Sequence, residues 1–323
     1  MKKTRKGKII AALVVLAMTA IALAGCGTGN SVSQVISVGT LKGPTGMGMI
    51  QLMDKTESYN VTTYEAPNEI TAKLINGELD VAAVPSNLAA VLYNKTKGNI
   101  IAISPNTLGI LYLTENKSNK IKNLSDIKDQ TIYASGKGGS PEYILQEVLK
   151  KNKVDYSSLN IKWLATHSDV TAAHMKDPGS IALLPEPFVT VATSKNPNLK
   201  VVSDLNKEWD KITHQDLPMG VLVAQKSFVE DKGSDLEIFL KDYEASVDFV
   251  NNNTKEAAKA IESQKIIANA KIAEKAIPKC NIVLLTNSQS KETLSAFYET
   301  LFKLDPKSIG GKIPGDDFYY KSK

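Results

Sequence analysis

Residues 77–87, Gly-Glu-Leu-Asp-Val-Ala-Ala-Val-Pro-Ser-Asn, predict a buried strand that runs directly into a helix. Leu79–Val84 is short and mostly apolar, which is typical of a strand covered on both faces. Pro85 ends this run, and Ser86 is well suited to cap a helix over Ser86–Thr96. A unit of this kind predicts an α/β protein whose ligand-binding groups lie at the ends of its strands.

The same alternation continues on both sides of this unit. Further strands are predicted over Gln34–Thr40, Tyr59–Ala66, Asn99–Ser104, Gln130–Ser135, Asn160–Ala165, Ser180–Leu184 and Leu199–Leu205. Helices are predicted over Thr45–Lys55, Asn68–Asn76, Lys122–Lys128, Ser140–Lys151, Ser168–Lys176 and Pro187–Ser194, and then over Asp235–Asn252, Lys255–Ser263, Asn269–Ala276 and Ser288–Leu304. Because helical segments of about ten residues separate the strands, we expect parallel strands with helices on both faces.

Two apolar segments, Gly109–Thr114 and Gly220–Gln225, are predicted to be strands that connect two lobes. The alternation of strands and helices restarts after the first segment, and a mostly helical region follows the second. We therefore expect residues 34–114 and 218–323 to form lobe 1, and residues 115–217 to form lobe 2.

The first 25 residues have the pattern of a secretory signal peptide. Five basic residues precede an apolar run from Ile9 to Leu23, and small residues then precede Cys26. This arrangement resembles a bacterial lipobox, which implies cleavage before Cys26 and a lipid on its sulfur, with residues 26–33 as a tether. The protein is then expected on the extracytoplasmic face of the cell membrane. The alternative is an uncleaved anchor, although the run is shorter than the ~20 residues of a spanning helix.

Composition limits the partners that we expect. The chain has 39 basic and 34 acidic residues, and residues 1–25 contain five of the basic ones and no acidic one, so 34 of each sign remain beyond the signal. This balance argues against a nucleic-acid partner. Arg5 is the only arginine, so after cleavage an anion has to be held by backbone N–H groups, hydroxyls or a lysine.

The chain carries little that predicts catalysis or metal binding. Cys280 has no partner for a disulfide once Cys26 is lipidated, and it lies in an apolar stretch. His167, His174 and His214 are the only histidines, and no zinc motif or nucleophile elbow accompanies them. His167 follows a strand and is either a ligand contact or a surface residue. We expect no metal, no cofactor and no enzymatic activity.

Four strand-to-helix junctions are the candidate binding segments: Gly39–Gly48, Val84–Asn87, Ser135–Tyr143 and Leu183–Phe188. Each combines glycine or proline with a residue suited to bind a ligand or cap a helix. The alternatives are a simple packed turn at the first junction, a surface cap at Glu186 and core packing for Met47. The expected ligand contacts are Lys42, Gly43, Thr45, Gly46, Met47, Ser86, Asn87, Asn106, Thr107, Ser135, Lys137, Gly138, Gly139, Ser140, Glu186 and Phe188.

Three of these segments, residues 41–46, 77–85 and 184–188, resemble the substrate-binding proteins of ABC importers, and most closely the nitrate/sulfonate/taurine-type branch. The resemblance implies a periplasmic-binding-protein fold of type II, with a mixed sheet flanked by helices in each lobe and two hinge strands. It also implies a monomer that closes over a small-molecule solute and docks on a membrane permease with its ATPase. The missing arginine weakens the case for a sulfonate or phosphonate.

Two other functions remain open at this point. A lipoprotein of this design could sense a solute and report to a membrane partner. Enzymes of the menaquinone pathway share the lobe design, although a lipobox argues against them because their substrates are cytoplasmic. The sequence does not identify the solute.

Overall fold

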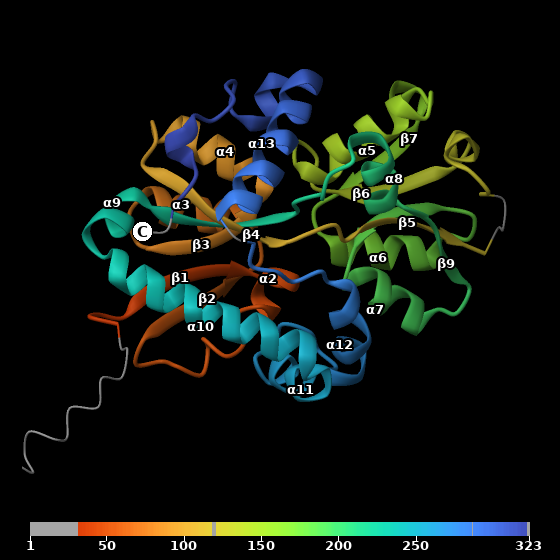
Figure 1. The fold of residues 1–323 in the computed structure, drawn as a ribbon. Helices are drawn as coiled ribbons and strands as arrows, with labels where there is room; N and C mark the ends of the chain where they lie inside the picture. Colours follow the sequence, from red (N-terminus) through yellow and green to blue (C-terminus); the bar gives the residue numbers. More distant parts are fainter. Residues whose placement is uncertain (1–31, 118–120, 286, 322–323) are drawn as a thin grey trace, which may run out of the picture. The chain divides into compact units, whose positions relative to one another are not determined.

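The computed structural model describes residues 32–117, 121–285 and 287–321 (Figure 1). The predicted signal peptide, the lipidated Cys26 and most of the tether lie outside these residues. Residues 32–323 form one compact unit. Within its described part, no helix is both long and apolar enough to cross a membrane. The unit is built on two five-stranded sheets, which confirms the α/β class and the mixed sheets expected from the sequence.

The first sheet has the strand order β2-β1-β3-β10-β4. Its strands are β1 (Ile36–Leu41), β2 (Tyr59–Tyr64), β3 (Val81–Pro85), β4 (Ile100–Thr107) and β10 (Gly220–Gln225). Strands β1, β2 and β3 are parallel, whereas β10 runs antiparallel to both of its neighbours, β3 and β4. The sheet therefore combines two stretches of chain that are far apart in the sequence.

The second sheet has the order β7-β6-β8-β5-β9. Its strands are β5 (Leu111–Asn116), β6 (Thr131–Ser135), β7 (Asn160–Leu164), β8 (Ile181–Pro185) and β9 (Leu199–Asp204). Strand β6 is parallel to β7 and β8, and β5 is antiparallel to β8 and β9. Both sheets thus place one antiparallel strand among parallel ones.

Side-chain alternation along the strands explains why helices cover both faces of the first sheet. In β3, Ala82 and Val84 enter one apolar cluster, whereas Val81 and Ala83 enter another. The first cluster contains α3 (Pro67–Ile75), α4 (Ser86–Lys95) and α13 (Asn287–Leu304). The second contains α2 (Pro44–Met47), α10 (Gly233–Asn252), α11 (Thr254–Ser263) and α12 (Ala270–Ala276). The short α9 (Lys226–Asp231) follows β10.

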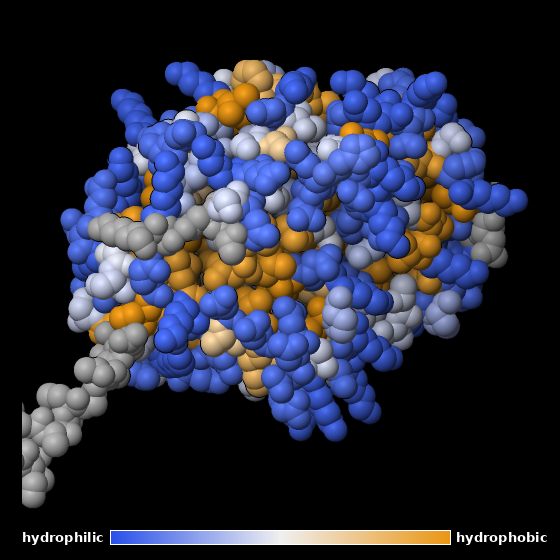
Figure 2. Space-filling model, in the orientation of Figure 1, coloured by the Kyte–Doolittle hydropathy of each residue, from blue (hydrophilic) through white to orange (hydrophobic). Residues whose placement is uncertain are grey.

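The second sheet is covered in the same way. Helices α5 (Ser140–Lys151) and α8 (Leu205–Thr213) contribute to the first apolar cluster, so this cluster runs through both lobes. Helices α6 (His167–Lys176) and α7 (Phe188–Lys195) lie on the other face around Val170, Val189 and Ala192. Hydrophilic side chains cover much of the face in Figure 2, with smaller apolar patches between them.

The chain crosses between the sheets twice. It passes from β4 to β5 over residues 108–110, and it returns from α8 to β10 over residues 214–219. The strands at these crossings each pair within one sheet: Leu111–Asn116 belongs to the second sheet and Gly220–Gln225 to the first. The sheet pairing thus changes between Thr107 and Leu111, a few residues before the predicted border at 114.

Two helix predictions differ from the structure. The helix expected over Thr45–Lys55 is only the four-residue α2, followed by turns. An added Cβ would lie 2.7 Å from the Leu41 carbonyl at Gly46 and 2.8 Å from the Tyr243 hydroxyl at Gly48, so these glycines allow close packing rather than a longer helix. The segment Lys122–Lys128 forms a 3₁₀ turn at Leu124–Ile127.

Besides the short α9, the helix α8 was not predicted. Its first turn is capped by the carboxylate of Asp204, which accepts hydrogen bonds from the backbone N–H groups of Asn206 and Lys207. Only Leu205 and Trp209 are buried in this helix. The sequence predicts a strand over Leu199–Leu205 and no element over residues 206–213, because two buried positions are too few to establish a helical pattern.

Candidate functional site

The strand directions bring the carboxyl ends of both sheets toward the crossings. In the first sheet, β1, β3 and β4 are parallel and end at the edge where β4 leads into residues 108–110. In the second sheet, β6, β7, β8 and β9 end at the edge where β5 begins. The four steps from Thr107 to Leu111 span at most about 14 Å. The two edges therefore lie close together at this crossing, as ligand sites of α/β sheets require.

Two of the predicted junctions touch across the lobes. Asn87 Oδ1 at the start of α4 accepts hydrogen bonds from the N–H and the hydroxyl of Ser140, at 3.2 and 3.0 Å. Both side chains are buried. At the other pair of junctions, an added Cβ on Gly43 would lie 3.9 Å from Pro187, so the loop before α2 approaches the turn before α7. The structure thus brings together Asn87 and Ser140 of the predicted set, and it places Gly43 beside Pro187.

A group of buried polar atoms without partners gathers at the strand ends of lobe 1. We call it the strand-end cluster: Thr40 Oγ1, Ser86 Oγ, Asn106 Nδ2 and Oδ1, Thr107 Oγ1 and Tyr243 Oη. It holds six of the nine such atoms found among the described residues, so the missing hydrogen bonds are concentrated in one place. Buried polar groups in native proteins nearly always have a partner. A polar molecule that reached this cluster would supply hydrogen bonds that the described part of the protein does not.

Asn106 lies in the middle of the cluster. An added Cβ on Gly220 would lie 2.5 Å from Asn106 Oδ1, 3.0 Å from Thr45 Cγ2 and 3.3 Å from Thr107 Cβ. Only glycine at position 220 leaves room for this arrangement. On the α10 side, burial raises the pKa of Tyr243 and its contact with Asn106 lowers it. Strands β4 and β10 and helix α10 thus position one unpartnered carboxamide.

The second lobe contributes a serine–histidine pair. Ser135 Oγ at the end of β6 lies 2.6 Å from His167 Nδ1 at the start of α6. The imidazole ring also packs against Phe188, with ring centroids 5.2 Å apart. Burial lowers the pKa of His167 to about 4, so the ring is neutral near pH 7. This pair offers neutral hydrogen-bonding groups beside an aromatic wall.

Glu186 does not point toward a free ligand position. Its carboxylate accepts hydrogen bonds from the backbone N–H and the hydroxyl of Thr190, each at 3.0 Å. Lys279 Nζ lies 4.0 Å away. Desolvation raises the pKa of this carboxyl, against the effect of these three contacts. The side chain therefore caps α7, which is the alternative that the sequence left open, although here the cap is buried.

Several other predicted contacts lie away from the cluster. Lys42 forms an ion pair with Glu65, and Met47 is fully buried in the apolar cluster of α10. Lys137 and Gly138 are exposed, and the Gly138 N–H donates to Glu142 Oε2 at 2.6 Å. Gly139 donates its N–H to Gly136 O at 3.0 Å.

Sequence reasoning missed two members of the cluster, Thr40 and Tyr243, and the role of Gly220. Thr40 is the penultimate residue of β1, a position that the strand-end rule would have included. Tyr243 lies in the middle of the twenty-residue helix α10, where its spacing fits the apolar stripe. Nothing in the local sequence marks it as a polar contact.

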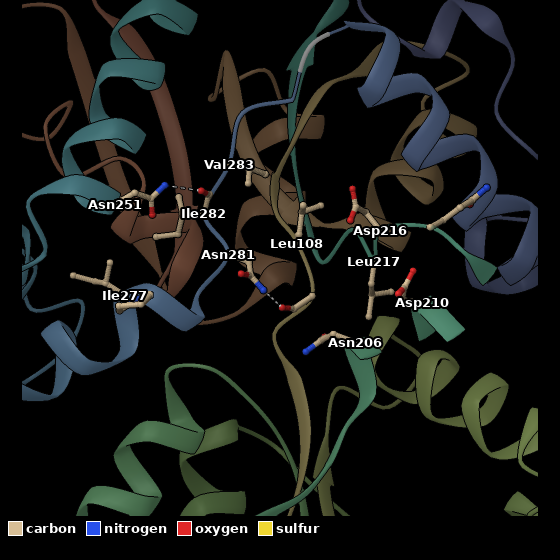
Figure 3. A pocket seen from close by; sticks show the side chains of 13 residues that line it. Leu108, Asn206, Asp210, Asp216, Leu217, Asn251, Ile277, Asn281, Ile282 and Val283 are labelled. Atoms are coloured by element: carbon tan, nitrogen blue, oxygen red, sulfur yellow. Dashed lines mark hydrogen bonds between the residues drawn. The ribbon is translucent and has the colours of Figure 1, made fainter. Parts of the chain in front are cut away.

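A pocket of about 390 Å³ lies at the crossings (Figure 3). Leu108, Gly109 and Leu217 of the two crossings line it together with Asn281. Asn281 donates a hydrogen bond to the carbonyl of Gly109, and its own carbonyl accepts one from Leu108 at 3.0 Å. On the other side, Asn206 Oδ1 accepts the N–H of Leu111 at 3.0 Å. Two asparagines thus fix the backbone of the first crossing.

A family of known proteins includes most of this chain. The model of a family described as menaquinone biosynthesis matches residues 47–303, which is most of the chain. The chain belongs to this family. No protein with a curated description matches it. Within the described residues, no group of three or more His, Cys, Asp or Glu side chains is arranged to hold a metal ion.

Solved structures of ABC-transporter binding proteins share the fold of this family member. An ABC transporter protein from Parabacteroides distasonis is 23% identical with a TM-score of 0.77, over 90% of this chain and 100% of that chain. The periplasmic aliphatic sulphonate binding protein SsuA from Escherichia coli is 15% identical with a TM-score of 0.68, over 86% and 96%. The ligand-binding component of an ABC-type import system from Staphylococcus aureus is 17% identical with a TM-score of 0.70, over 90% and 97%. The expected two-lobe fold is confirmed.

Proposed function

We propose that this protein is an extracytoplasmic solute-binding lipoprotein that captures a small solute between its lobes and delivers it to the permease of an ABC importer. The strand-end cluster is the observation on which the proposal rests. Its six buried polar atoms lack partners at the edge where the two sheets approach each other. A solute held there would supply the missing hydrogen bonds, and leaving them unmade costs about 1–3 kcal/mol per group.

Binding would work by closure of two lobes about the crossings. We place lobe 1 on either side of an inserted lobe 2, with borders between Thr107 and Leu111 and between Thr213 and Gly220. A solute that touches both lobes binds the closed form more tightly than the open form and so shifts the equilibrium toward closure. The neighbour from Staphylococcus aureus is named as the ligand-binding component of an ABC-type import system, and the one from Escherichia coli as a periplasmic binding protein, which supports this role.

Membrane attachment through Cys26 is the second part of the proposal. Acyl chains on this cysteine would hold the protein at the outer face of the membrane, close to a permease. Replacement Cys26→Ser should release the protein into the medium or the soluble fraction. Continued membrane retention of this variant, with an intact N-terminus, would show a peptide anchor instead.

The test of solute binding starts from the protein as its own cells make it. The full chain is purified in detergent, denatured, and the released small molecules are identified by mass spectrometry. Adding the identified solute at a hundred times its dissociation constant should stabilise the protein by about 2.7 kcal/mol. Gly220→Ala should abolish co-purification, because its Cβ would lie 2.5 Å from Asn106 Oδ1. Gly233→Ala is the matched control, since nothing lies within 4 Å of an added Cβ there.

A second candidate function is an enzyme of menaquinone biosynthesis. The family match and the Ser135–His167 pair at 2.6 Å favour it, because a neutral imidazole can accept a proton from a nearby hydroxyl. The two functions differ in what a deletion strain lacks. Loss of menaquinone, rescued by the wild type but not by His167→Ala, would favour the enzyme. Normal menaquinone with loss of uptake of the co-purified solute would favour transport.

A further inference from the structure

The charges around the strand-end cluster restrict the class of solute. All of its members are uncharged, namely Thr40, Ser86, Asn106, Thr107 and Tyr243. Of the charged side chains at the four junctions, Lys137 is exposed on the loop before α5, and two others have partners within the protein. Lys42 pairs with Glu65, and Glu186 bonds to Thr190 with Lys279 beside it. No arginine occurs after Arg5. A charged solute would therefore lose its hydration without meeting an opposite charge, which is costly.

The helix N-termini at the junctions do not provide an alternative site for an anion. Helices bind anions through the free N–H groups of their first turn. At α4, the N–H of Ser86 donates to Met219 O at 3.2 Å and that of Asn87 to Ser140 Oγ at 3.4 Å. At α5, the N–H of Ser140 donates to Asn87 Oδ1. These donors already have partners within the protein.

The starts of two further helices at this edge, α6 and α7, are capped by side chains. At α6, the N–H of Asp169 donates to Thr166 Oγ1 at 3.1 Å. At α7, the N–H of Thr190 donates to the Glu186 carboxylate, which would also repel an anion. The fifth helix at this edge, α2, has only four residues and a correspondingly small dipole. Of the three kinds of group with which this chain could hold an anion, the strand-end cluster therefore offers only uncharged hydroxyls, and neither a lysine nor a free helix N-terminus.

Asn106 specifies what an uncharged solute has to offer. Its side chain is fully buried, its amide oxygen lacks a hydrogen-bond partner, and its amide nitrogen has only a weak contact with the hydroxyl of Tyr243. A carboxamide donates from nitrogen and accepts at oxygen, side by side in one plane. Another amide satisfies both atoms at once, with its own carbonyl oxygen facing the nitrogen and its N–H facing the oxygen. The surrounding hydroxyls can either donate or accept, so they do not select against this pairing.

We propose that the solute is uncharged and presents an amide edge, a carbonyl oxygen next to an N–H, to the side chain of Asn106. The inference rests on the proposed binding function and names the substrate class of that same site. It separates this protein from the neighbours that are named as sulfonate-binding proteins.

Matched probes test the class directly. Nicotinamide, nicotinate and pyridine-3-sulfonate have the same ring and differ only in one substituent, which is an amide, a carboxylate or a sulfonate. Propionamide, propionate and ethanesulfonate repeat the comparison without a ring. Calorimetric titration of the full chain in detergent should give at least about tenfold tighter binding for the amide of each set. Tighter or equal binding of either anion would overturn the proposed class and leave the binding function standing.

Variants at Asn106 assign the contact. Asn106→Asp keeps the shape but replaces the amide nitrogen by oxygen and adds charge, so it should weaken amide binding at least about tenfold. Asn106→Leu removes both unpartnered atoms and should fold at least as well while losing the amide. The matched control is Asn60→Asp, at an exposed position of β2 in the same sheet. Amide binding that survives Asn106→Asp overturns the assignment.

If none of the probe molecules binds, the chemical class of the co-purified solute tests the inference. An uncharged amide-containing solute that is absent from Asn106→Asp supports the inference. A carboxylate, sulfonate or phosphate solute overturns it, although the protein still binds a solute. If no solute co-purifies and no probe binds, the binding function fails and the inference fails with it.

Discussion

The carboxamide oxygen of Asn87 accepts two hydrogen bonds from Ser140, one from its backbone N–H at 3.2 Å and one from its hydroxyl at 3.0 Å. Asn87 opens α4 on the first sheet, and Ser140 opens α5 on the second. The contact therefore joins the two lobes at a buried position, in addition to the covalent crossings.

This contact predicts an energetic coupling between the two residues. Asn87→Ala and Ser140→Ala should each lower the free energy of unfolding by about 1–3 kcal/mol, because each leaves a buried polar group unpaired. The double variant should cost less than the sum, with a coupling of about 0.5–3 kcal/mol in urea unfolding. Small-angle scattering should also show a larger radius of gyration for both single variants. Ser295→Ala, on an exposed part of α13, is the control and should stay within about 0.5 kcal/mol of wild type. Strict additivity would mean that the contact does not form in solution.

Substitution of Gly109 at the first crossing is predicted to lower the stability of the protein. An added Cβ would lie 2.5 Å from Asn206 Oδ1 and 2.7 Å from Asn206 Cβ. Gly109→Ala should therefore displace Asn206, break its hydrogen bond from the N–H of Leu111, and cost about 1–3 kcal/mol in chemical unfolding. Gly233→Ala, at the start of α10 with open space around it, should be neutral or stabilise by up to about 1 kcal/mol. Equal stability of the two variants would contradict the packing described for the crossing.

The buried His174 predicts a dependence of stability on pH. Its ring lies 3.0 Å from Thr114 Oγ1 and 2.9 Å from Ser180 Oγ, and burial lowers its pKa to about 4. The unfolded chain, with a histidine pKa near 6.5, binds more protons between about pH 4 and 6.5. Stability should therefore rise with pH through this window, by up to about 1.4 kcal/mol per unit, and then level off. Urea unfolding from pH 5 to 8.5 measures this slope.

The variant His174→Gln isolates this contribution. It should flatten the dependence below about pH 6.5, while the curves of variant and wild type stay parallel above about pH 7.5, where histidine is neutral in both states. His167, with its pKa lowered to about 4, should leave part of the slope in place. Curves that remain parallel over the whole range would show that His174 is protonated alike in the folded and unfolded chain.

Variants at Met47 distinguish a side chain that packs in the core from one that contacts the solute. Its side chain is fully buried among residues of α10 and neighbouring helices. Met47→Ala should cost about 2–5 kcal/mol, whereas Met47→Leu should cost less than about 1.5 kcal/mol and leave the affinity for the co-purified solute unchanged. Thermal unfolding and calorimetric titration measure the two effects. A large loss of affinity in the leucine variant at normal stability would place the side chain against the solute.

The sequence predicted the parts of this protein that depend on local pattern. The apolar runs at β3 and β8 and the Ser140-Pro141 helix start lie within one or two residues of their predicted positions. The restart of the strand–helix alternation predicted two lobes, and the resemblance to a family implied the same design. The side-chain contact between the lobes could not be predicted from the sequence, because the hydrogen bond between Asn87 and Ser140 joins residues 53 positions apart.

The candidate site was predicted only where a strand end coincides with a polar residue. Ser86, Asn106 and Thr107 fit that rule and lie in the strand-end cluster. Glu186 and Met47 also fit a strand end or a helix start. Glu186 is occupied by a local cap with Thr190, and Met47 by tertiary contacts with α10. Tyr243 lies far from any strand end in the sequence. Its placement depends on how α10 packs, which no local spacing reveals.

The position of β10 in the first sheet has a consequence for the order in which the chain can fold. This strand lies between β3 and β4, although it is the last of the ten to be synthesised. During synthesis from the amino end, the second sheet can assemble from contiguous residues. In the first sheet, β4 has no pairing partner until β10 has been synthesised up to residue 225. The first lobe is therefore the first to be synthesised and the last to complete its sheet. Until β10 pairs, the exposed edges of β3 and β4 need protection from pairing with other chains.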